Sequence, residues 1–266
     1  MNKIILSRKG YDDQYGGKPS PILPDGTMLS FPIPILDSEE NGLQSHELTF
    51  EDKTLSEYFA ALGHKTTEHK HHVDPDIYGF SGKQPMGTFG QAGAALGHLD
   101  NQKVGEGDVF LFFGTFCKTI YYEEQLQYEK MHPVHAMFGY LVVDKRVNMD
   151  EIDEKTELFW LKSHPHYINR NIGDYAKANA IFIGSDYGYF RFSDRLQLTK
   201  PGYLKSYWEL PAVFANIKMT YHEKAHKQLI ADWVAFTSVA KGQEFVFDRI
   251  PEIEPWLQEV LGHRVK

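Results

Sequence analysis

The chain has 266 residues, 42% of them hydrophobic, and a formal net charge of −8 at pH 7. This charge excludes a protein that binds nucleic acid through uniform electrostatic attraction, but not one with a local basic groove. It is long enough to bury a substantial core, and no run reaches the roughly 18 apolar residues of a membrane span. The short apolar stretch behind Lys3 does not suit a signal peptide, and the single cysteine, Cys117, excludes an intrachain disulfide, so we expect a cytoplasmic protein without a membrane partner.

The first predicted strand, Lys3–Ser7, runs into a loop that concentrates acids, glycines and prolines. Prolines recur through residues 11–35 and exclude a helix there. Pro24–Gly26 has the chemistry of a turn, with Asp25 at its centre. A helix is predicted over Leu55–Leu62, capped by Thr54 or Ser56 and ended by Gly63.

The apolar patterns farther along the chain predict more strands than helices. Val109–Phe113 and Ala136–Val143 are continuously apolar, as in strands covered on both faces. Shorter strands are predicted at residues 158–161 and 180–183, a turn at 184–188, and helices at 87–98, 220–239 and 255–261. We therefore expect one α+β domain over residues 1–266, with a mixed, mostly buried β-sheet, flanking helices that include a C-terminal pair at about 220–262, and long irregular loops.

The loop after the first strand is the first candidate site. Asp12 and Asp13 follow a buried strand, and Gly16 and Gly17 allow close backbone approach to a ligand. The alternative is a tight turn whose acids bond to nearby amides. The dinucleotide and P-loop glycine patterns are both absent from this stretch.

Histidines and acids gather in three further places. The run from His64 to Asp76 could hold a divalent ion through His72, Asp74 and Asp76, or be a solvated polar loop, and Pro75 stiffens it between the two acids. MHPVH and SHPHY place His135 and His166 beside predicted strands, as general acids or bases or as ordinary hydrogen-bonding residues. Around Arg191, tyrosines and phenylalanines either stack on a base or pack into the core.

Several blocks of the sequence resemble the nucleotide modification associated domain 3 family. They are KIILSRKGYDDQYGGKPSPILPDGTMLSFPIP, HVDPDIYGF, FGQAGAALGHL with GDVFLFFGTF, MFGYLVV and SHPHY, and they span roughly residues 3 to 220. The resemblance implies a link to base modification in DNA, in bacterial and phage settings that include phage defence. It supplies no catalytic residues, and the site assignments rest on side-chain chemistry.

Three functional hypotheses follow. The first is an enzyme that acts on a nucleotide or a modified base in DNA, by hydrolysis or transfer at a glycosidic or base-substituent bond with Asp and His acid–base groups. The others are a non-catalytic reader of a modified base and a metal-dependent hydrolase. No organic cofactor is expected, and a divalent metal is an open alternative. The candidate catalytic residues are Asp12, Asp13, Asp74, His164 and His166; the candidate ligand-binding residues are Tyr11, Gly16, Gly17, Asp25, Asp76, Tyr187, Tyr189 and Arg191.

Overall fold

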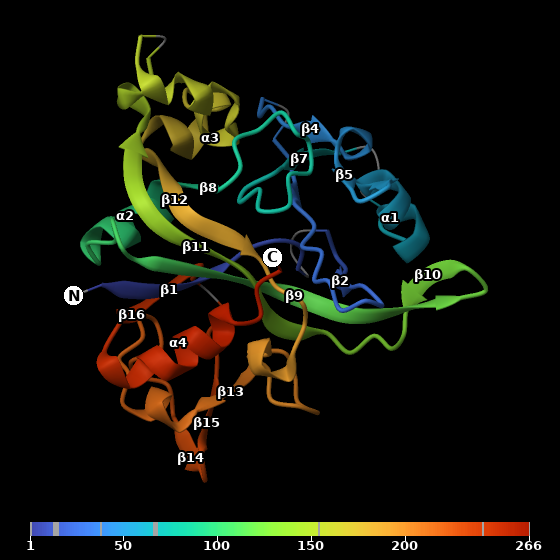
Figure 1. Cartoon of the computed structure of the whole chain (residues 1–266), viewed down its shortest axis with the longest axis vertical. Coiled ribbons are helices and arrows are strands. Elements are labelled where there is room, and N and C mark those ends of the chain that lie inside the picture. The colour runs from blue at the N-terminus through green and yellow to red at the C-terminus, as the bar shows by residue number, and fades with distance from the viewer. Residues whose placement is uncertain are drawn as a thin grey trace.

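A curled, mixed β-sheet forms the centre of the protein in the computed structural model, which describes residues 2–12, 16–37, 39–65, 69–153, 155–240 and 242–265. Its strands run in the order β16-β1-β9-β11-β12-β8, and β2 and β10 both pair with the C-terminal part of β9. The strand β1 pairs parallel with β9, while β16, β11, β12 and β8 pair antiparallel with their neighbours (Figure 1). The bounds are β1 Lys3–Arg8, β2 Ser20–Ile22, β8 Thr88–Ala92, β9 Val109–Tyr122, β10 Gln125–Tyr128, β11 Val134–Asn148, β12 Asn179–Tyr189 and β16 Glu244–Asp248.

The two long strands confirm the apolar runs and extend beyond them. Both faces of β9 are buried from Val109 to Cys117, where elements cover the sheet on both sides. Beyond that point exposed residues appear, because β9 leaves the core and pairs with β10 in a projecting hairpin (Figure 1). The predicted apolar run, Val109–Phe113, therefore lies within the covered part of the strand, which reaches Cys117, and does not mark the whole strand.

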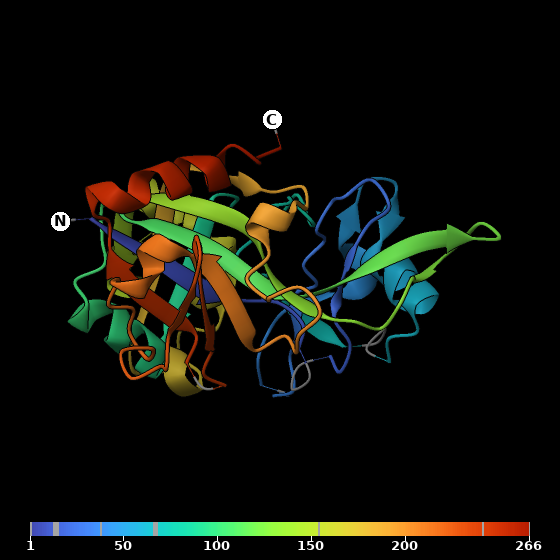
Figure 2. The same cartoon turned by 90° about the horizontal axis from the view of Figure 1, so that it is seen from below.

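Small sheets and short helices flank the central sheet. Figure 2 shows α4 and α2 on opposite sides of it. The small sheets are β3-β7-β4, β5-β6 and β13-β15-β14. The bounds are α1 Leu55–Leu62, α2 Gly93–Asn101, α3 Pro165–Ile168, α4 Glu254–Leu261, β3 Ile33–Pro34, β4 Leu43–Gln44, β5 Thr49–Phe50, β6 Lys53–Thr54, β7 Lys70–His72, β13 Tyr207–Pro211, β14 Gln228–Ile230 and β15 Trp233–Thr237. The mixed α+β fold is as expected from the sequence.

Local signals set the ends of α1 as predicted. The Thr54 side chain accepts a hydrogen bond from the Glu57 amide, and Glu57 in turn accepts from the Thr54 amide, which forms a capping box. Gly63 ends the helix in the left-handed conformation, with φ of 66°. Phe59 on the buried face of α1 packs into a second core that is separate from the one around the central sheet.

The proline-rich N-terminal loop supplies much of this second core. Tyr11 is fully buried there, stacked on Phe59 with ring centroids 5.7 Å apart and edge-on to Phe31 at the same distance. A Cβ on Gly16 would lie 2.2 Å from the Tyr11 ring, so only glycine allows this approach. The irregular loop is thus ordered by aromatic packing that the prolines help to preset.

Four sequence-based assignments were wrong. Residues 220–239 form no helix: β14 and β15 lie there, and Val234 and Phe236 are buried at the two-residue spacing of a strand while Leu229 is exposed. The predicted strand at 158–161 is part of a 3₁₀ helix, Glu157–Ser163, and the predicted turn at 184–188 continues β12. The predicted helix at 87–98 divides into β8 and α2. In each case pairing with a distant strand or packing overrode the local pattern.

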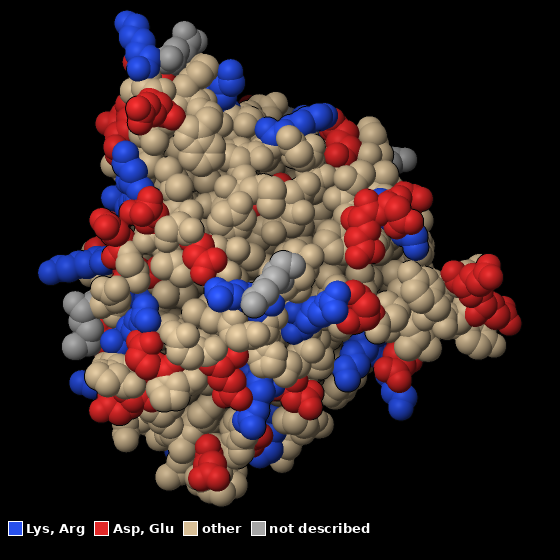
Figure 3. All heavy atoms as spheres, in the orientation of Figure 1, with Lys and Arg blue, Asp and Glu red and all other residues tan. Residues whose placement is uncertain are grey.

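Charges of both signs are interspersed on the face of the molecule shown in Figure 3, with no continuous basic surface. This distribution agrees with the net charge of −8 and gives that face little attraction for a phosphate backbone. Among the described residues, no helix has the length and apolar character needed to cross a membrane.

We expect buried histidines to make the protein less stable in mild acid. Burial lowers the pKa of His135 to about 3, and Trp208 Nε1 donates to its Nδ1 at 3.0 Å. The unfolded chain takes up this proton near pH 6.5 and the folded protein does not, so the free energy of unfolding falls as the pH drops, by up to about 1.4 kcal/mol per pH unit for this residue.

Urea unfolding of the wild type and His135→Gln at several pH values tests this expectation. The variant should be less stable than the wild type at pH 7.5, and the difference should shrink between pH 6 and pH 5. The exposed His132 is the matched control, since His132→Gln should leave the pH dependence unchanged. A difference for His135→Gln that stays constant with pH would contradict the expectation.

Candidate functional site

A cleft of about 610 Å³ opens between the end of β1, the loop after β7 and the segment around α3. Its size lies within the range of small-molecule sites, about 300 to 1,000 Å³. Asp74, His72 and His166 lie on one side, with Arg8 and Lys9 also in the lining. Aromatic side chains form much of the remaining surface: Phe31, Tyr78, Phe80, Phe89, Phe138 and Tyr175.

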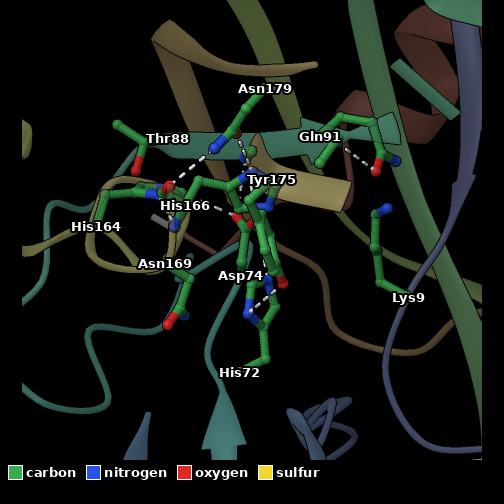
Figure 4. Close-up of polar contacts among 12 residues, drawn as sticks. Lys9, His72, Asp74, Thr88, Gln91, His164, His166, Asn169, Tyr175 and Asn179 are labelled. Carbon is green, nitrogen blue, oxygen red and sulfur yellow. Dashed lines mark hydrogen bonds and ion pairs between the residues drawn. The ribbon is translucent and has the colours of Figure 1, made fainter. Parts of the chain in front are cut away.

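Asp74 is the centre of the site, and its side chain is only 2% exposed. The amide of Gly90 in β8 donates to both carboxylate oxygens, at 3.1 and 2.9 Å from Oδ1 and Oδ2. Three imidazoles surround it, those of His72, His164 and His166 (Figure 4). Burial would raise the pKa of Asp74, but the hydrogen bonds that His166 and His72 donate when their rings carry both protons, together with the charge of those rings, outweigh burial and hold the pKa well below its usual range.

His166 is fixed in one orientation by Asn179 at the start of β12. Asn179 Nδ2 donates to the His166 carbonyl at 2.9 Å, which turns the amide oxygen Oδ1 toward His166 Nδ1 at 2.7 Å. Nδ1 therefore carries a proton and donates it to Asn179. The other ring nitrogen, Nε2, faces Asp74 Oδ2 at 3.2 Å. In the neutral ring its lone pair points toward Asp74.

His164 lies behind this arrangement and does not line the cleft. Its Nδ1 accepts a hydrogen bond from the amide of His166 at 3.1 Å and so caps the short helix α3. Burial lowers the pKa of His164 to about 3, which keeps the ring neutral. The single proton is then on Nε2, 3.7 Å from Asp74 Oδ1. His164, a candidate catalytic residue, therefore contacts the His166 amide and Asp74 from outside the cleft lining.

His72 stands at the end of β7, with Nε2 3.7 Å from Asp74 Oδ2. Its Nδ1 lies 3.5 Å from the hydroxyl of Tyr175. Burial raises the pKa of Tyr175, so this phenol keeps its proton. The Tyr175 ring also meets His166 edge-on, with centroids 4.9 Å apart. Tyr175 thus contacts both imidazoles that line the cleft.

A second polar group, on the side of β1 and β16, lies away from Asp74 (Figure 4). Lys9 Nζ is 3.0 Å from Glu244 Oε1 and 4.4 Å from the centre of the Phe89 ring. Gln91 Nε2 donates to the same Glu244 oxygen at 2.6 Å, and Ser7 Oγ donates to it at 3.1 Å. The positive charge of Lys9 is therefore balanced largely within the protein.

The structure brings together some of the residues predicted from sequence. Asp12 and Asp74 line the same cleft, as predicted, and His166 joins them. Asp13 lies outside the described residues. Tyr11 and Gly16 pack into the second core, and neither they nor Gly17 line the cleft.

The remaining ligand-binding candidates lie elsewhere. Asp25 accepts from the amide and hydroxyl of Thr27 and is 3.6 Å from Arg191, both far more exposed than Asp74. Tyr189 packs on Tyr78, with ring centroids 5.0 Å apart, and the Tyr187 ring fills the space that a Cβ on Gly87 would need. None of Asp25, Tyr187, Tyr189 and Arg191 lines the cleft.

Asp76 also turns away from Asp74. It accepts hydrogen bonds from the amides of Gly79 and Phe80 at 2.7 and 3.2 Å and so closes the loop that follows. Burial raises the pKa of Asp76. The sequence offered His72, Asp74 and Asp76 as an alternative metal set; the donors that converge in the structure are His72, Asp74 and His166. His135, in the other predicted histidine loop, packs beside Trp208 instead.

Sequence reasoning missed Tyr175, Asn179 and Gly90, each of which holds a member of the group in place. Each stands in a local pattern that carries no chemical signal. Gly90 and Asn179 come together through the pairing of β8 with β12, and Tyr175 lies four residues before Asn179. The alternation of His and Asp in HVDPD was a usable signal, since residues two apart in an extended chain point to the same side.

We expect Gly90→Ala to disrupt the site. A Cβ at this position would lie 2.3 Å from Cδ2 of His166, so the ring must move and the bond from the Gly90 amide to Asp74 must shift with it. Such overpacking should lower the free energy of unfolding by about 1 to 3 kcal/mol. Unfolding in urea measures the loss, and histidine ring resonances report the displacement of His166.

Gly97 in α2 provides the control. No atom lies within 4 Å of a Cβ added there, so Gly97→Ala should be neutral or stabilise the helix by up to about 1 kcal/mol. Equal changes in the free energy of unfolding for the two substitutions would mean that the close contact between Gly90 and His166 does not affect stability.

Comparison with known proteins places this site in a family context. Neither the curated proteins nor the solved structures contain a match to the chain. A family model described as nucleotide modification associated domain 3 matches residues 3–248, which include every residue of the Asp74 group and leave out α4. Because the match covers most of the 266 residues, the chain belongs to the nucleotide modification associated domain 3 family.

Proposed function

We propose that this protein is an enzyme that modifies a nucleotide or a base in DNA, with its chemistry at Asp74 and the imidazoles beside it. The observation that carries the proposal is a carboxylate, 2% exposed, that contacts three imidazoles and lines a cleft of about 610 Å³. A buried charge is costly unless it is paired, and clusters of titratable groups in clefts are typical of catalytic sites.

The cleft suits a planar ligand with little reliance on phosphate. Its aromatic side chains offer faces on which a base can stack. Its basic residues are already engaged: Lys9 pairs with Glu244, and the Arg8 guanidinium donates to the carbonyls of Val239 and Ala240. Asp37, Glu40 and Asp174 add negative charge to the lining. The lining of the cleft therefore suits recognition of a base better than recognition of the phosphate backbone of a nucleic acid.

The position of Asp74 sets a condition on a DNA substrate. A base stacked in a duplex cannot reach a carboxylate that is almost completely buried, so the base must be flipped out of the helix or presented by a single strand or a free nucleotide. We therefore expect single-stranded DNA or mononucleotides to be better substrates than intact duplex.

The roles of the side chains follow from their geometry. Asp74, held ionised, stabilises positive charge next to it or orients water. Asn179 fixes the proton on the other ring nitrogen of His166, so Nε2 presents a lone pair beside Asp74, where it can accept a proton or bind a cation. Hydrolysis or group transfer at a glycosidic or base-substituent bond is the reaction class that these groups serve. Asp12, also in the cleft lining, is a further carboxylate near the substrate.

The test compares Asp74→Asn with Asp76→Asn. Both replace a buried carboxylate by an amide of the same shape, but only Asp74 lines the cleft. Product formation from a panel of nucleotides, single-stranded DNA and DNA with modified bases is followed by mass spectrometry. We expect Asp74→Asn to lower turnover by about 100-fold or more, and Asp76→Asn to retain it.

Two results would contradict the proposal. One is turnover by Asp74→Asn equal to that of the wild type. The other is tight binding of a modified base by the wild type with no product under any condition, which is the behaviour of a reader. Thermal unfolding of each variant separates lost chemistry from lost folding.

A further inference from the structure

We propose that His72, Asp74 and His166 bind one divalent transition-metal ion, whose remaining coordination positions face the cleft. This inference rests on the proposed function, since it assigns a cofactor to the same site. All three residues line the cleft, and their ligand atoms lie within 4.8 Å of one another.

The distances suit metal coordination. His166 Nε2 and His72 Nε2 lie 3.2 and 3.7 Å from Asp74 Oδ2. With metal–ligand bonds of about 2.1 Å, neighbouring donor atoms are about 3.0 Å apart in an octahedral site and about 3.4 Å apart in a tetrahedral one. The two measured separations are close to these values. The ligand nitrogens of His72 and His166 form the third pair and lie within 4.8 Å of one another. The contact of His72 with Tyr175 is 3.5 Å long, so a metal ion could draw the His72 ring closer.

Hydrogen bonds to the Nδ1 atoms of His72 and His166 leave the Nε2 lone pairs of both rings facing Asp74. Asn179 accepts the proton of His166 Nδ1, which leaves Nε2 free to bind a metal. The Tyr175 hydroxyl is placed to accept from His72 Nδ1 in the same way. His164 has the opposite tautomer. Its Nδ1 accepts a hydrogen bond from the His166 amide, so its Nε2 carries the proton and has no lone pair for a metal. The network thus selects two of the three imidazoles as ligands.

Charge balance supports the same conclusion. Among the described residues, the ion pairs of Asp74 are with histidines, and none is with lysine or arginine. A carboxylate this deeply buried needs a positive partner. A dication bound to neutral imidazoles supplies it, while the Gly90 amide orients the carboxylate from behind.

The donor set narrows the choice of ion. Two imidazole nitrogens and one carboxylate suit iron(II), zinc(II), manganese(II) or cobalt(II) better than magnesium or calcium, which prefer oxygen ligands. Three protein ligands leave positions for water or substrate, as in catalytic and not in structural sites. The same combination holds both catalytic zinc(II) and non-haem iron(II), so these are the two ions expected first.

Cobalt(II) is the probe for the test, because its visible absorption reports coordination directly. The full chain is stripped with a chelator, then titrated with cobalt(II) and, under anaerobic conditions, iron(II), by absorption and calorimetry. We expect saturable binding of one ion per chain and a higher melting temperature with the ion present. Asp74→Asn and His166→Ala should abolish the cobalt spectrum, and Asn179→Ala should weaken binding by about 10- to 100-fold.

Asp76→Asn is the matched control, because it changes a buried carboxylate two residues from Asp74 that turns away from the site, and it should bind cobalt(II) like the wild type. Absence of saturable binding to the folded wild type, or binding unchanged in Asp74→Asn, overturns the metal site. The proposed function is judged separately. If the chelator-treated, metal-free protein still turns over substrate, the metal site is not needed for activity and the metal proposal fails, while the proposed enzyme function stands. If the protein binds one ion tightly but turns over no substrate, the metal proposal stands and the proposed enzyme function fails.

Discussion

The placement of a negatively charged carboxylate in a nearly solvent-free position is the constraint on which the site depends. Water cannot pair with Asp74 there, so the carboxylate depends on hydrogen-bond donors and positive charge placed beside it. The Gly90 amide donates to it and three imidazoles surround it, from segments far apart in the chain, and the dication proposed above would supply the charge. Each of these segments is held in turn by packing or hydrogen bonds that leave little freedom.

The central sheet brings these segments together. The antiparallel pairing of β8 with β12 places Gly90 and Asn179 on adjacent strands, and α3 lies beside them with His164 and His166. The parallel pairing of β1 with β9 carries the chain to Lys9 and Gly10 at the cleft. The cleft therefore lies where the end of a buried strand meets loops from both halves of the chain, a common position for sites in sheet proteins.

The chemistry of the cleft is divided between its sides. Around Asp74, the histidines and Tyr175 provide groups that can bind a cation or move a proton. On the β1 and β16 side, Lys9 and Glu244 neutralise one another, which leaves a polar but weakly charged surface. Aromatic rings form much of the remaining lining. Such a division agrees with the proposed ligand, whose planar portion would stack on the rings while one bond would face Asp74.

The sequence by itself determined the features that depend on neighbours in the chain. The buried lengths of β1, β9 and β11 follow from apolar runs, and the ends of α1 follow from Thr54 and Gly63. The motifs HVDPD and SHPHY identified Asp74 and His166 as candidates, because several acids and histidines concentrated in a short loop can be recognised from sequence alone. The family match agrees with the resemblance seen in the same blocks.

Only the tertiary structure decided which of these residues act together. Residues 220–239 carry apolar residues at helical spacing, yet β15 pairs with β13 and β14, and that pairing outweighs local preference. Tyr11 and Gly16 look like ligand-binding residues in sequence but fill the second core. Asp76 follows Asp74 by two residues, but hydrogen bonds to the Gly79 and Phe80 amides turn it away from the cleft. His166 takes its place beside Asp74, because contacts between distant segments depend on packing and strand order, which no local pattern contains.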